Sequence, residues 1–325
     1  MTVATIRSFE MGKSTRVAYG ETLRELGRER SDIVVLDADL SKSTQTALFG
    51  KEFPDRWFNI GIQEANLVSM ASGFASSGYV PFISSFAVFL VCKGFDQLRM
   101  GVAYPGINVK VVTSHGGISI GQDGPSQMGI EDLGLACSLP GFVVCCPADE
   151  VSARELVRDT AAHDSAVYLR TGRPAVPIIY GVDHPPETFR LGKSVQIEDG
   201  GDVTIIACGL MVSEALIAHD ILAAEGIGAR VIDMHTLKPL DGESVERAAR
   251  ETGAIVTAEE HLLHGGLGSI VAQFASKHHP VPIESVGVED TYAESGSPDE
   301  LLDRYGLRAV NIAEAARRSV ARKSS

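Results

Sequence analysis

The sequence predicts an α/β protein made of two doubly wound domains with mainly parallel sheets. Short apolar runs of strand length alternate with helix-like segments along the whole chain. A stretch rich in Pro and Gly interrupts this alternation once, over residues 174–201. A length of 325 residues also fits two domains of roughly 150 residues each. We therefore expect a first domain over residues 1–180, a linker over 181–200 and a smaller second domain over 201–325.

Each expected strand is a short apolar run bounded by Gly, Pro or Asp, which is typical of buried parallel strands. In the first half these runs are residues 33–37, 80–84, 109–113, 142–146 and 167–170, and the helices between them are 16–29, 64–76, 89–102, 131–138 and 148–162. In the second half the strands are 203–208, 229–233, 255–259 and 283–288, and the helices are 213–225, 242–251, 268–276 and two more from Pro298 and Ile312.

The composition excludes several classes of protein. Lys and Arg number 29 against 42 Asp and Glu, a net charge of −13, which argues against a nucleic-acid or anionic-membrane surface. The five cysteines form no CxxC motif and indicate reduced thiols and a cytoplasmic location. We see no hydrophobic leader segment and no apolar run long enough to span a bilayer.

Two segments at the starts of helices carry candidate functional side chains. Glu64 opens an apolar helix, where a carboxylate either complements the helix dipole or serves chemistry. Phe86 and Phe89 lie three residues apart and share one helix face. Such a pair belongs either to the core or to a site for a ligand with a flat ring.

The most unusual stretch is a glycine-rich loop over residues 113–127, directly after a strand. It holds His115 and Asp123, and ligands of α/β proteins gather at the carboxyl ends of strands. Packing explains such a loop poorly, so its composition favours a functional role. The surroundings of Ser119 match the G-x-S-x-G motif of serine hydrolases, but the Gln-Asp-Gly-Pro that follows cannot start the helix that this motif requires.

Taken in order, these segments resemble the transketolase family of thiamine diphosphate enzymes, specifically its pyrimidine-binding domain followed by its C-terminal domain. The resemblance covers nearly the whole chain, and its second half is shared with deoxyxylulose-phosphate synthase and 2-oxoacid dehydrogenase β subunits. The matching segments are residues 38–40, 59–64 and 86–89, His115 with residues 123–125, and residues 259–261, 265–268 and 294–296.

The resemblance implies that thiamine diphosphate is the cofactor. Glu64 matches the family's catalytic glutamate, whose carboxyl group hydrogen-bonds to N1′ of the aminopyrimidine ring. Phe86 and Phe89 match the aromatic side chains that pack on this ring, and Asp39 is also implied in cofactor binding. Cys92 stands where the family usually has a third ring, so the shape of this pocket departs from the family pattern.

The resemblance also implies a phosphosugar substrate. His115, which is implied in catalysis as well, and Asp123 match residues that contact the hydroxyl groups of the donor sugar. Gln127 stands where the family has a further histidine, which leaves the identity of the donor and acceptor sugars open. Three more residues match positions that bind the substrate phosphate: Arg170, Arg16 and Ser43.

The family's Gly-Asp-Gly motif, which with a later Asn holds the diphosphate and Mg²⁺, has no counterpart in this sequence. The nearest string, residues 122–124, has no Asn after it until Asn311. The resemblance therefore implies a split transketolase, whose separate N-terminal subunit carries the diphosphate-binding domain and the Mg²⁺ ligands. We expect an α2β2 assembly that transfers a two-carbon ketol group from a ketose phosphate to an aldose phosphate.

Three alternatives stay open at this point. A 2-oxoacid dehydrogenase β subunit shares the architecture but decarboxylates a 2-oxoacid, and a deoxyxylulose-phosphate synthase-like subunit is a second relative. The loop with His115 and the presence of Arg170 favour a phosphosugar over a 2-oxoacid. A non-catalytic partner of another enzyme is the third alternative, and Glu64 argues against it.

Overall fold

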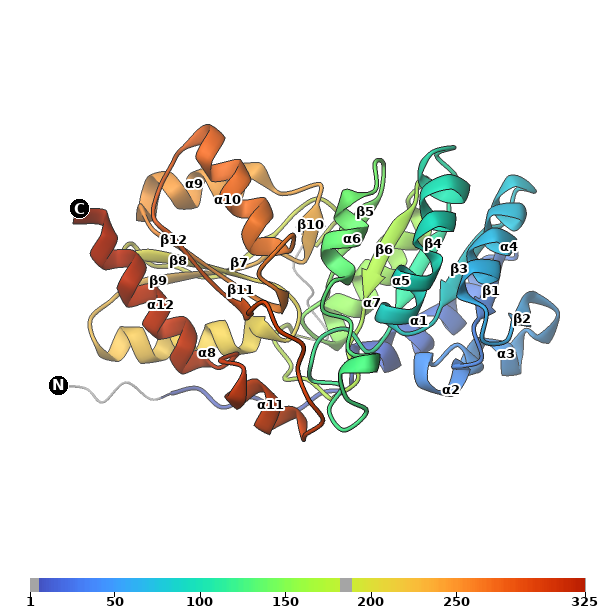
Figure 1. The fold of residues 1–325 in the computed structure, drawn as a ribbon, viewed down its shortest axis with the longest axis horizontal. Coiled ribbons are helices and arrows are strands. Elements are labelled where there is room, and N and C mark those ends of the chain that lie inside the picture. The colour runs from blue at the N-terminus through green and yellow to red at the C-terminus, as the bar shows by residue number, and fades with distance from the viewer. Residues whose placement is uncertain (1–5, 182–188, 325) are drawn as a thin grey trace.

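The computed structural model describes residues 6–181 and 189–324, which form two α/β domains side by side (Figure 1). Each domain has one central sheet with helices on both faces, as the sequence predicts. The expected linker over 181–200 lies partly outside the described residues, because residues 182–188 are not among them.

The first sheet has seven strands in the order β10-β5-β6-β4-β3-β1-β2, and its strand pairs are parallel except that between β10 and β5. Several of its strands are buried along their whole length, because helices cover both faces. The first domain contributes β1 (Ile33–Asp37), β2 (Trp57–Asn59), β3 (Val80–Ser84), β4 (Lys110–Thr113), β5 (Val143–Cys145) and β6 (Val167–Arg170).

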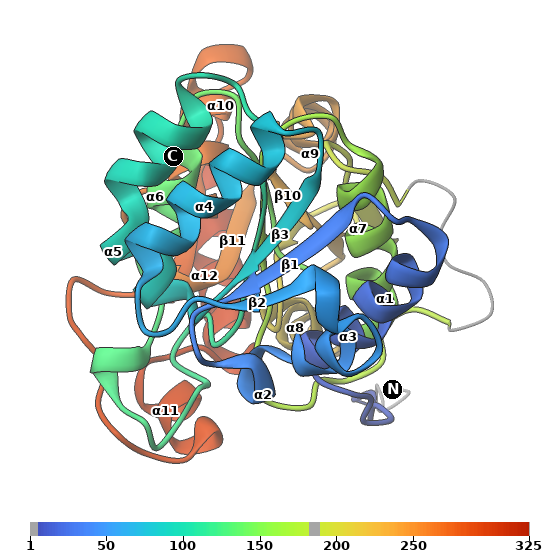
Figure 2. The same ribbon diagram turned by 90° about the vertical axis from the view of Figure 1, so that its right-hand side faces the viewer.

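Two groups of helices cover the first sheet, and Figure 2 shows them on its opposite faces. One group is α1 (Thr15–Glu29), α3 (Ala47–Glu52) and α7 (Glu150–Ala162). The other is α4 (Glu64–Ser76), α5 (Ala87–Gln97) and α6 (Asp132–Ser138). Shorter elements are α2 (Ser41–Thr44), the 3₁₀ turns Pro54–Arg56 and Pro125–Gln127, and the π-helical turn Leu98–Ala103.

The second sheet has five strands in the order β12-β11-β8-β9-β7. They are β7 (Val195–Glu198), β8 (Val203–Ala207), β9 (Ala229–Asp233), β11 (Ile255–Leu262) and β12 (Ile283–Val288). Its helices are α8 (Met211–Ala224), α9 (Gly242–Thr252), α10 (Leu267–His278), α11 (Pro298–Arg304) and α12 (Ala309–Ala321), followed by the 3₁₀ turn Arg322–Ser324. Helices α8 and α12 lie on one face of this sheet, and α9 and α10 on the other (Figure 1).

Strand β2 and the helices α2 and α3 were not expected from the sequence, and three further elements differ from the expectation. Residues 195–198, expected in the linker, form β7, an antiparallel edge strand. Its half-polar sequence does not resemble a buried strand, and it lies next to a segment rich in Pro and Gly. Strand β10 (Thr236–Lys238) comes from the second half of the chain but pairs antiparallel with β5 of the first sheet. The helix expected over 89–102 ends at Gln97 and continues as a π-helical turn.

A buried carboxyl group at the end of β9 makes stability depend on pH. Oδ2 of Asp233 accepts the hydroxyl of Tyr180 at 2.6 Å, and burial together with the charge of Asp149 raises the pKa of Asp233 to about 8. An unfolded Asp has a pKa of about 3.9, so between these values the folded chain binds the extra proton. This contribution to stability is complete below about pH 4 and is lost as the pH rises through about 8.

Asp233→Asn is expected to flatten this pH dependence, because the amide stays neutral and can still accept the Tyr180 hydroxyl. Thermal unfolding of both proteins at acidic and at alkaline pH measures the difference. The variant should gain most, relative to the unsubstituted chain, at the alkaline end. Equal losses in both proteins on going to alkaline pH would show that Asp233 is not the titrating group.

Within the described residues, no helix combines the length and the apolar character needed to cross a membrane.

Candidate active site

The candidate residues gather where the parallel strands of the first sheet end, the edge at which α/β proteins bind ligands. Three described residues other than Gly have positive φ angles: Asp39 at 65°, Gln45 at 70° and His115 at 60°. Asp39 follows β1 and His115 follows β4, so two of the three are candidates from the sequence. Such backbone conformations cost of order 1–3 kcal/mol and concentrate at functional sites.

Glu64 is the first residue of α4 and is only 2% exposed. The hydroxyl of Ser85, in the loop after β3, donates to its Oε1 at 3.2 Å, which fixes the carboxyl group beside Phe86. A residue serving only the helix dipole has no need of burial, because exposed first-turn carboxylates interact with the dipole as well. The burial of Glu64 therefore favours a chemical role.

An aromatic stack lies next to Glu64. The Phe86 ring lies 3.7 Å, centroid to centroid, from the His115 imidazole at 20°, and 5.5 Å from the Phe89 ring at 14°. Backbone bonds hold the two loops together: Ser114 N donates to Ser85 O at 3.1 Å, and Ala87 N donates to Ser114 O at 2.8 Å. The structure thus brings Glu64, Phe86, Phe89 and His115, which the sequence predicts separately, into one cluster.

The ammonium group of Lys93 contacts two members of this cluster. Nζ of Lys93 lies 3.5 Å from Oε2 of Glu64 and 5.0 Å from the centroid of the Phe89 ring, although the Lys93 side chain is 55% exposed. A buried carboxylate and the face of an aromatic ring therefore meet at a point reachable from solvent. A flat heterocycle with a ring N–H needs a hydrogen-bond acceptor and an aromatic face to pack on, so the residues present fit the aminopyrimidine of thiamine diphosphate.

His115 is buried and uncharged. Burial, with the nearby charges of Arg16 and Arg173, lowers its pKa to about 3, and Nδ1 bonds to the Ser114 hydroxyl at 2.8 Å. At neutral pH the imidazole can therefore donate or accept a single proton at its other nitrogen without carrying charge.

We expect the His115 ring to stay neutral at every pH above about 4, which NMR titration of the imidazole can measure. Because an unfolded His has a pKa of about 6.5, the unfolded chain takes up this proton first as the pH falls. His115 therefore contributes stability above about pH 6.5 that is lost as the pH falls toward 3. A ring that titrates near 6.5 in the folded chain would disprove this assignment.

Two arginines beside His115 form an unsaturated cationic site. Nη1 of Arg16 donates to the backbone oxygen of Ser43 at 2.8 Å, while its buried Nε has no hydrogen-bond partner in the described chain. Burial and the like charge of Arg173 both lower the pKa of Arg16. Arg173 bonds to the Ile120 backbone oxygen and lies 3.8 Å from a carboxylate oxygen of Asp123. Two neighbouring guanidinium groups with a donor to spare suit an anionic group such as phosphate.

Arg170, expected at the substrate phosphate, lines a pocket between the two domains with Gly116 and Thr15. It is 4% exposed, its Nε lies 3.3 Å from Oδ2 of Asp132, and its Nη2 donates to the backbone oxygens of Gly129 and Glu260 at 2.8 Å each. These contacts of Nε and Nη2 hold the guanidinium between the two domains. Arg173, three residues further along, is the arginine that accompanies Arg16, and sequence reasoning missed it although both arginines stand in one Arg-Thr-Gly-Arg-Pro segment.

The remaining candidates are Asp39, Cys92 and Gln127, which make few side-chain hydrogen bonds among the described residues. Oδ1 of Asp39 accepts a bond from Nδ2 of Asn59 at 2.8 Å, which links the loops after β1 and β2. Cys92 lies at the surface of α5, and partial desolvation of its thiol, together with the charges of Glu131 and Asp132, raises the pKa of the thiol. Gln127 is partly buried in a 3₁₀ turn, and its backbone N–H bonds to Gly124.

The structure also bears on the serine-hydrolase motif. Ser119 lies in a turn and is 1% exposed, and the next regular elements are the short 3₁₀ turn at Pro125 and α6 from Asp132. The strand–serine–helix geometry of a nucleophile elbow is therefore absent at this point. Among the described residues, no group of three or more His, Cys, Asp or Glu side chains could hold a metal ion.

Comparison with known proteins defines the class of this chain. Residues 11–178 match the family described as "Transketolase, pyrimidine binding domain", and residues 192–312 match "Transketolase, C-terminal domain". The chain is thus a pyrimidine-binding domain joined to a transketolase C-terminal domain. It belongs to the transketolase family.

Individual relatives of the same length are subunits or sections of transketolases. The chain is 43% identical over 303 residues, 93% of this chain and 95% of the other, to a protein of Methanocaldococcus jannaschii named as a transketolase C-terminal section. It is 41% identical over 310 residues, 95% of each chain, to the 6-deoxy-6-sulfo-D-fructose transketolase subunit SqwH of a Clostridium species. A solved structure described as a split gene transketolase, an inactive β4 tetramer, superposes with a TM-score of 0.89 at 46% identity, covering 96% of this chain and all of that one (100%).

Proposed function

We propose that this chain is the pyrimidine-binding subunit of a split transketolase that transfers a two-carbon ketol group from a ketose phosphate to an aldose phosphate. The observation that carries the proposal is the cluster of buried Glu64 with the stacked rings of Phe86 and His115 at the carboxyl edge of the sheet. The bound cofactor supplies a nucleophilic carbon that breaks and forms carbon–carbon bonds beside a carbonyl group.

In this proposal the side chains of this chain hold, orient and exchange protons. Glu64 binds the ring nitrogen of the aminopyrimidine, in place of the Lys93 ammonium that now faces it. Phe86 and Phe89 pack against the ring. His115, kept neutral by its surroundings, hydrogen-bonds a hydroxyl or carbonyl oxygen of the donor sugar, and Asp123 contacts a further hydroxyl.

The anionic end of the sugar is bound by Arg16 and Arg173. Both lie close enough to His115 to lower its pKa, so one substrate can reach all three side chains. The unpartnered Nε of Arg16 is a further donor, and a charge-assisted bond from a guanidinium to a phosphate oxygen is stronger than one to an uncharged hydroxyl oxygen.

A separate subunit is proposed to carry the diphosphate-binding domain and the Mg²⁺ ligands. Five of the nine large apolar side chains exposed in the described chain lie on or beside α4 and the π-helical turn after α5. They are Ile62, Met70, Tyr79, Met100 and Tyr104. Exposed apolar surface of this kind marks an interaction site, and it adjoins the helix that begins at Glu64. The relatives described as a C-terminal section and as an inactive β4 assembly support the same division of labour.

Gentle purification of the tagged chain from its host tests the proposal. We expect a partner polypeptide with the Gly-Asp-Gly motif and a later Asn to co-purify, together with bound thiamine diphosphate. A chain that emerges alone and binds no cofactor when Mg²⁺ and thiamine diphosphate are supplied would instead indicate a regulatory or degenerate subunit.

A further inference from the structure

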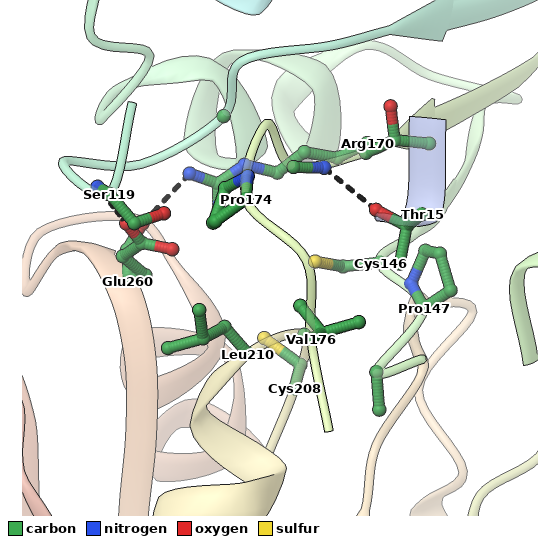
Figure 3. A pocket seen from close by; sticks show the side chains of 15 residues that line it. Thr15, Ser119, Cys146, Pro147, Arg170, Pro174, Val176, Cys208, Leu210 and Glu260 are labelled. Carbon is green, nitrogen blue, oxygen red and sulfur yellow. Dashed lines mark hydrogen bonds between the residues drawn. The ribbon is translucent and has the colours of Figure 1, made fainter. Parts of the chain in front are cut away.

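The second domain places a buried carboxyl group against the glycine-rich loop of the first domain. Glu260 lies on β11, is 7% exposed, and its Oε1 accepts the backbone N–H of Ser119 at 2.5 Å. The N–H of Ile118 faces the same carboxyl group. Figure 3 shows this contact in the wall of a pocket between the two domains, with Ser119 and Glu260 next to each other on the same side.

Two glycines let the loop pass between a carboxylate and a guanidinium. A Cβ atom at Gly117 would lie 2.1 Å from the carboxyl carbon of Glu260, and one at Gly116 would lie 1.9 Å from Nε of Arg170. Real Cβ atoms essentially never approach other atoms within 3.0 Å, and Gly117 also has a φ angle of +85°. Only glycine fits at residue 117, and this tight passage begins immediately after His115.

Arg170 holds the same region from the first domain. Its Nη2 donates to the backbone oxygens of Glu260 and Gly129 at 2.8 Å each, so it ties β11 to the far end of the same loop. Burial raises the pKa of Glu260, and the charge of Arg170 opposes that change, which helps keep the carboxyl group ionised. The loop that carries His115 and Asp123 is thus held at several backbone positions by one charged residue from each domain.

We propose that Glu260 is a positioning residue, through which the second domain fixes the glycine-rich loop and thereby the His115 imidazole for sugar binding. This inference rests on the proposed function, because it is there that His115 contacts the sugar. It gives the second domain a role in recognising the substrate. Glu260 acts on the backbone of the loop, and no contact of Glu260 with the reacting atoms is needed.

The carboxylate chemistry explains the choice of residue. Both oxygens of a carboxylate accept hydrogen bonds, so Glu260 can serve the N–H groups of Ile118 and Ser119 together. Glutamine is uncharged, has one acceptor oxygen and turns a donor NH₂ group toward the loop, so it holds the N–H groups of Ile118 and Ser119 more weakly than the carboxylate does. At the limit, a buried donor left without any partner costs enough to change an equilibrium roughly 5- to 100-fold.

The test compares Glu260→Gln with Glu259→Gln in the complex of this chain with its diphosphate-binding partner. Glu259 is a matched control, because it is the neighbouring residue on β11, is also buried, and accepts the backbone N–H groups of Leu267 and Gly268 at 2.7 and 2.8 Å within its own domain. We expect Glu260→Gln to lower kcat/KM for the ketose phosphate by about 10- to 100-fold, mainly through a higher KM. The affinity for thiamine diphosphate should stay unchanged. Glu259→Gln should lower thermal stability and leave the KM for the sugar as it was.

A second variant approaches the same contact from the loop. Gly117→Ala leaves Glu260 and its charge in place but drives a methyl group into the carboxylate, and it should raise the KM for the sugar in the same way. This variant decides the question if Glu260→Gln does not fold. If Glu260→Gln and Gly117→Ala had the same KM for the sugar as Glu259→Gln, Glu260 would not be a positioning residue. The proposed function would be unaffected by that result. A wild-type complex that binds cofactor but transfers no ketol group would overturn both.

Discussion

Glu64→Gln is expected to reduce kcat for ketol transfer at least about a hundredfold, the usual order for losing a group that exchanges a proton during catalysis. The amide keeps the volume of the side chain and can still accept the Ser85 hydroxyl, so the local packing should survive. What it loses is the ionisable carboxyl group that we propose to bind the ring nitrogen of the cofactor. Steady-state assays of the two-chain complex measure the effect, and circular dichroism and thermal unfolding verify the fold.

Glu150→Gln is the control for this variant. Glu150 is the first residue of α7, as Glu64 is of α4, so both carboxylates have the same relation to a helix dipole. If Glu64 only complemented the dipole, the two substitutions would have the same small effect on stability and none on activity. Near-full activity of Glu64→Gln would contradict the catalytic assignment.

Arg16→Met and Arg173→Met are each expected to lower kcat/KM for a phosphorylated ketose by about 10- to 100-fold, because a hydrogen bond to a charged group contributes roughly 1.5–3 kcal/mol. The activity toward a ketose donor that lacks the phosphate should change little. This selectivity follows from the proposed role of the two guanidinium groups near His115, of which Arg16 has a buried Nε without a partner in the described chain. Kinetics with phosphorylated and unphosphorylated donors measure it.

Arg28→Met provides the comparison on the same helix. Arg28 also lies on α1, but its guanidinium pairs with Glu52 at the surface. Its loss should leave kcat/KM unchanged for both the phosphorylated and the unphosphorylated ketose. Equal losses with both donors in the Arg16 and Arg173 variants would place these residues in the general structure of the site and remove them from phosphate binding.

The sequence was sufficient to predict most of the fold, because buried parallel strands and amphipathic helices leave strong local patterns. Strand β1 was predicted with its observed bounds for this reason. Strands β2, β7 and β10 were missed because each has few residues, and β7 and β10 are held by antiparallel pairing with strands that are distant in the sequence. The end of α5 at Gln97 was missed as well, since an apolar pattern does not distinguish a π-helical turn from a continuing α-helix.

Site residues could be predicted where they belong to a recognisable sequence motif. Glu64 and His115 could be named from their segments, and the structure places both beside Phe86. The other features depend on tertiary contacts. Such contacts determine that Arg170 is buried between the domains while Arg173 is not. They also bring Glu260 of the second domain to the glycine-rich loop of the first. Positions separated by 141 residues leave no local pattern that links them.

The central claim is tested most directly by assaying the purified two-chain complex, with Mg²⁺ and thiamine diphosphate, for carbon transfer. A ketose phosphate with an aldose phosphate and, separately, pyruvate serve as substrates. The account predicts transfer of a two-carbon unit between the sugar phosphates only when both chains are present, and no consumption of pyruvate. Consumption of pyruvate without ketol transfer would contradict it and identify a 2-oxoacid dehydrogenase type of subunit.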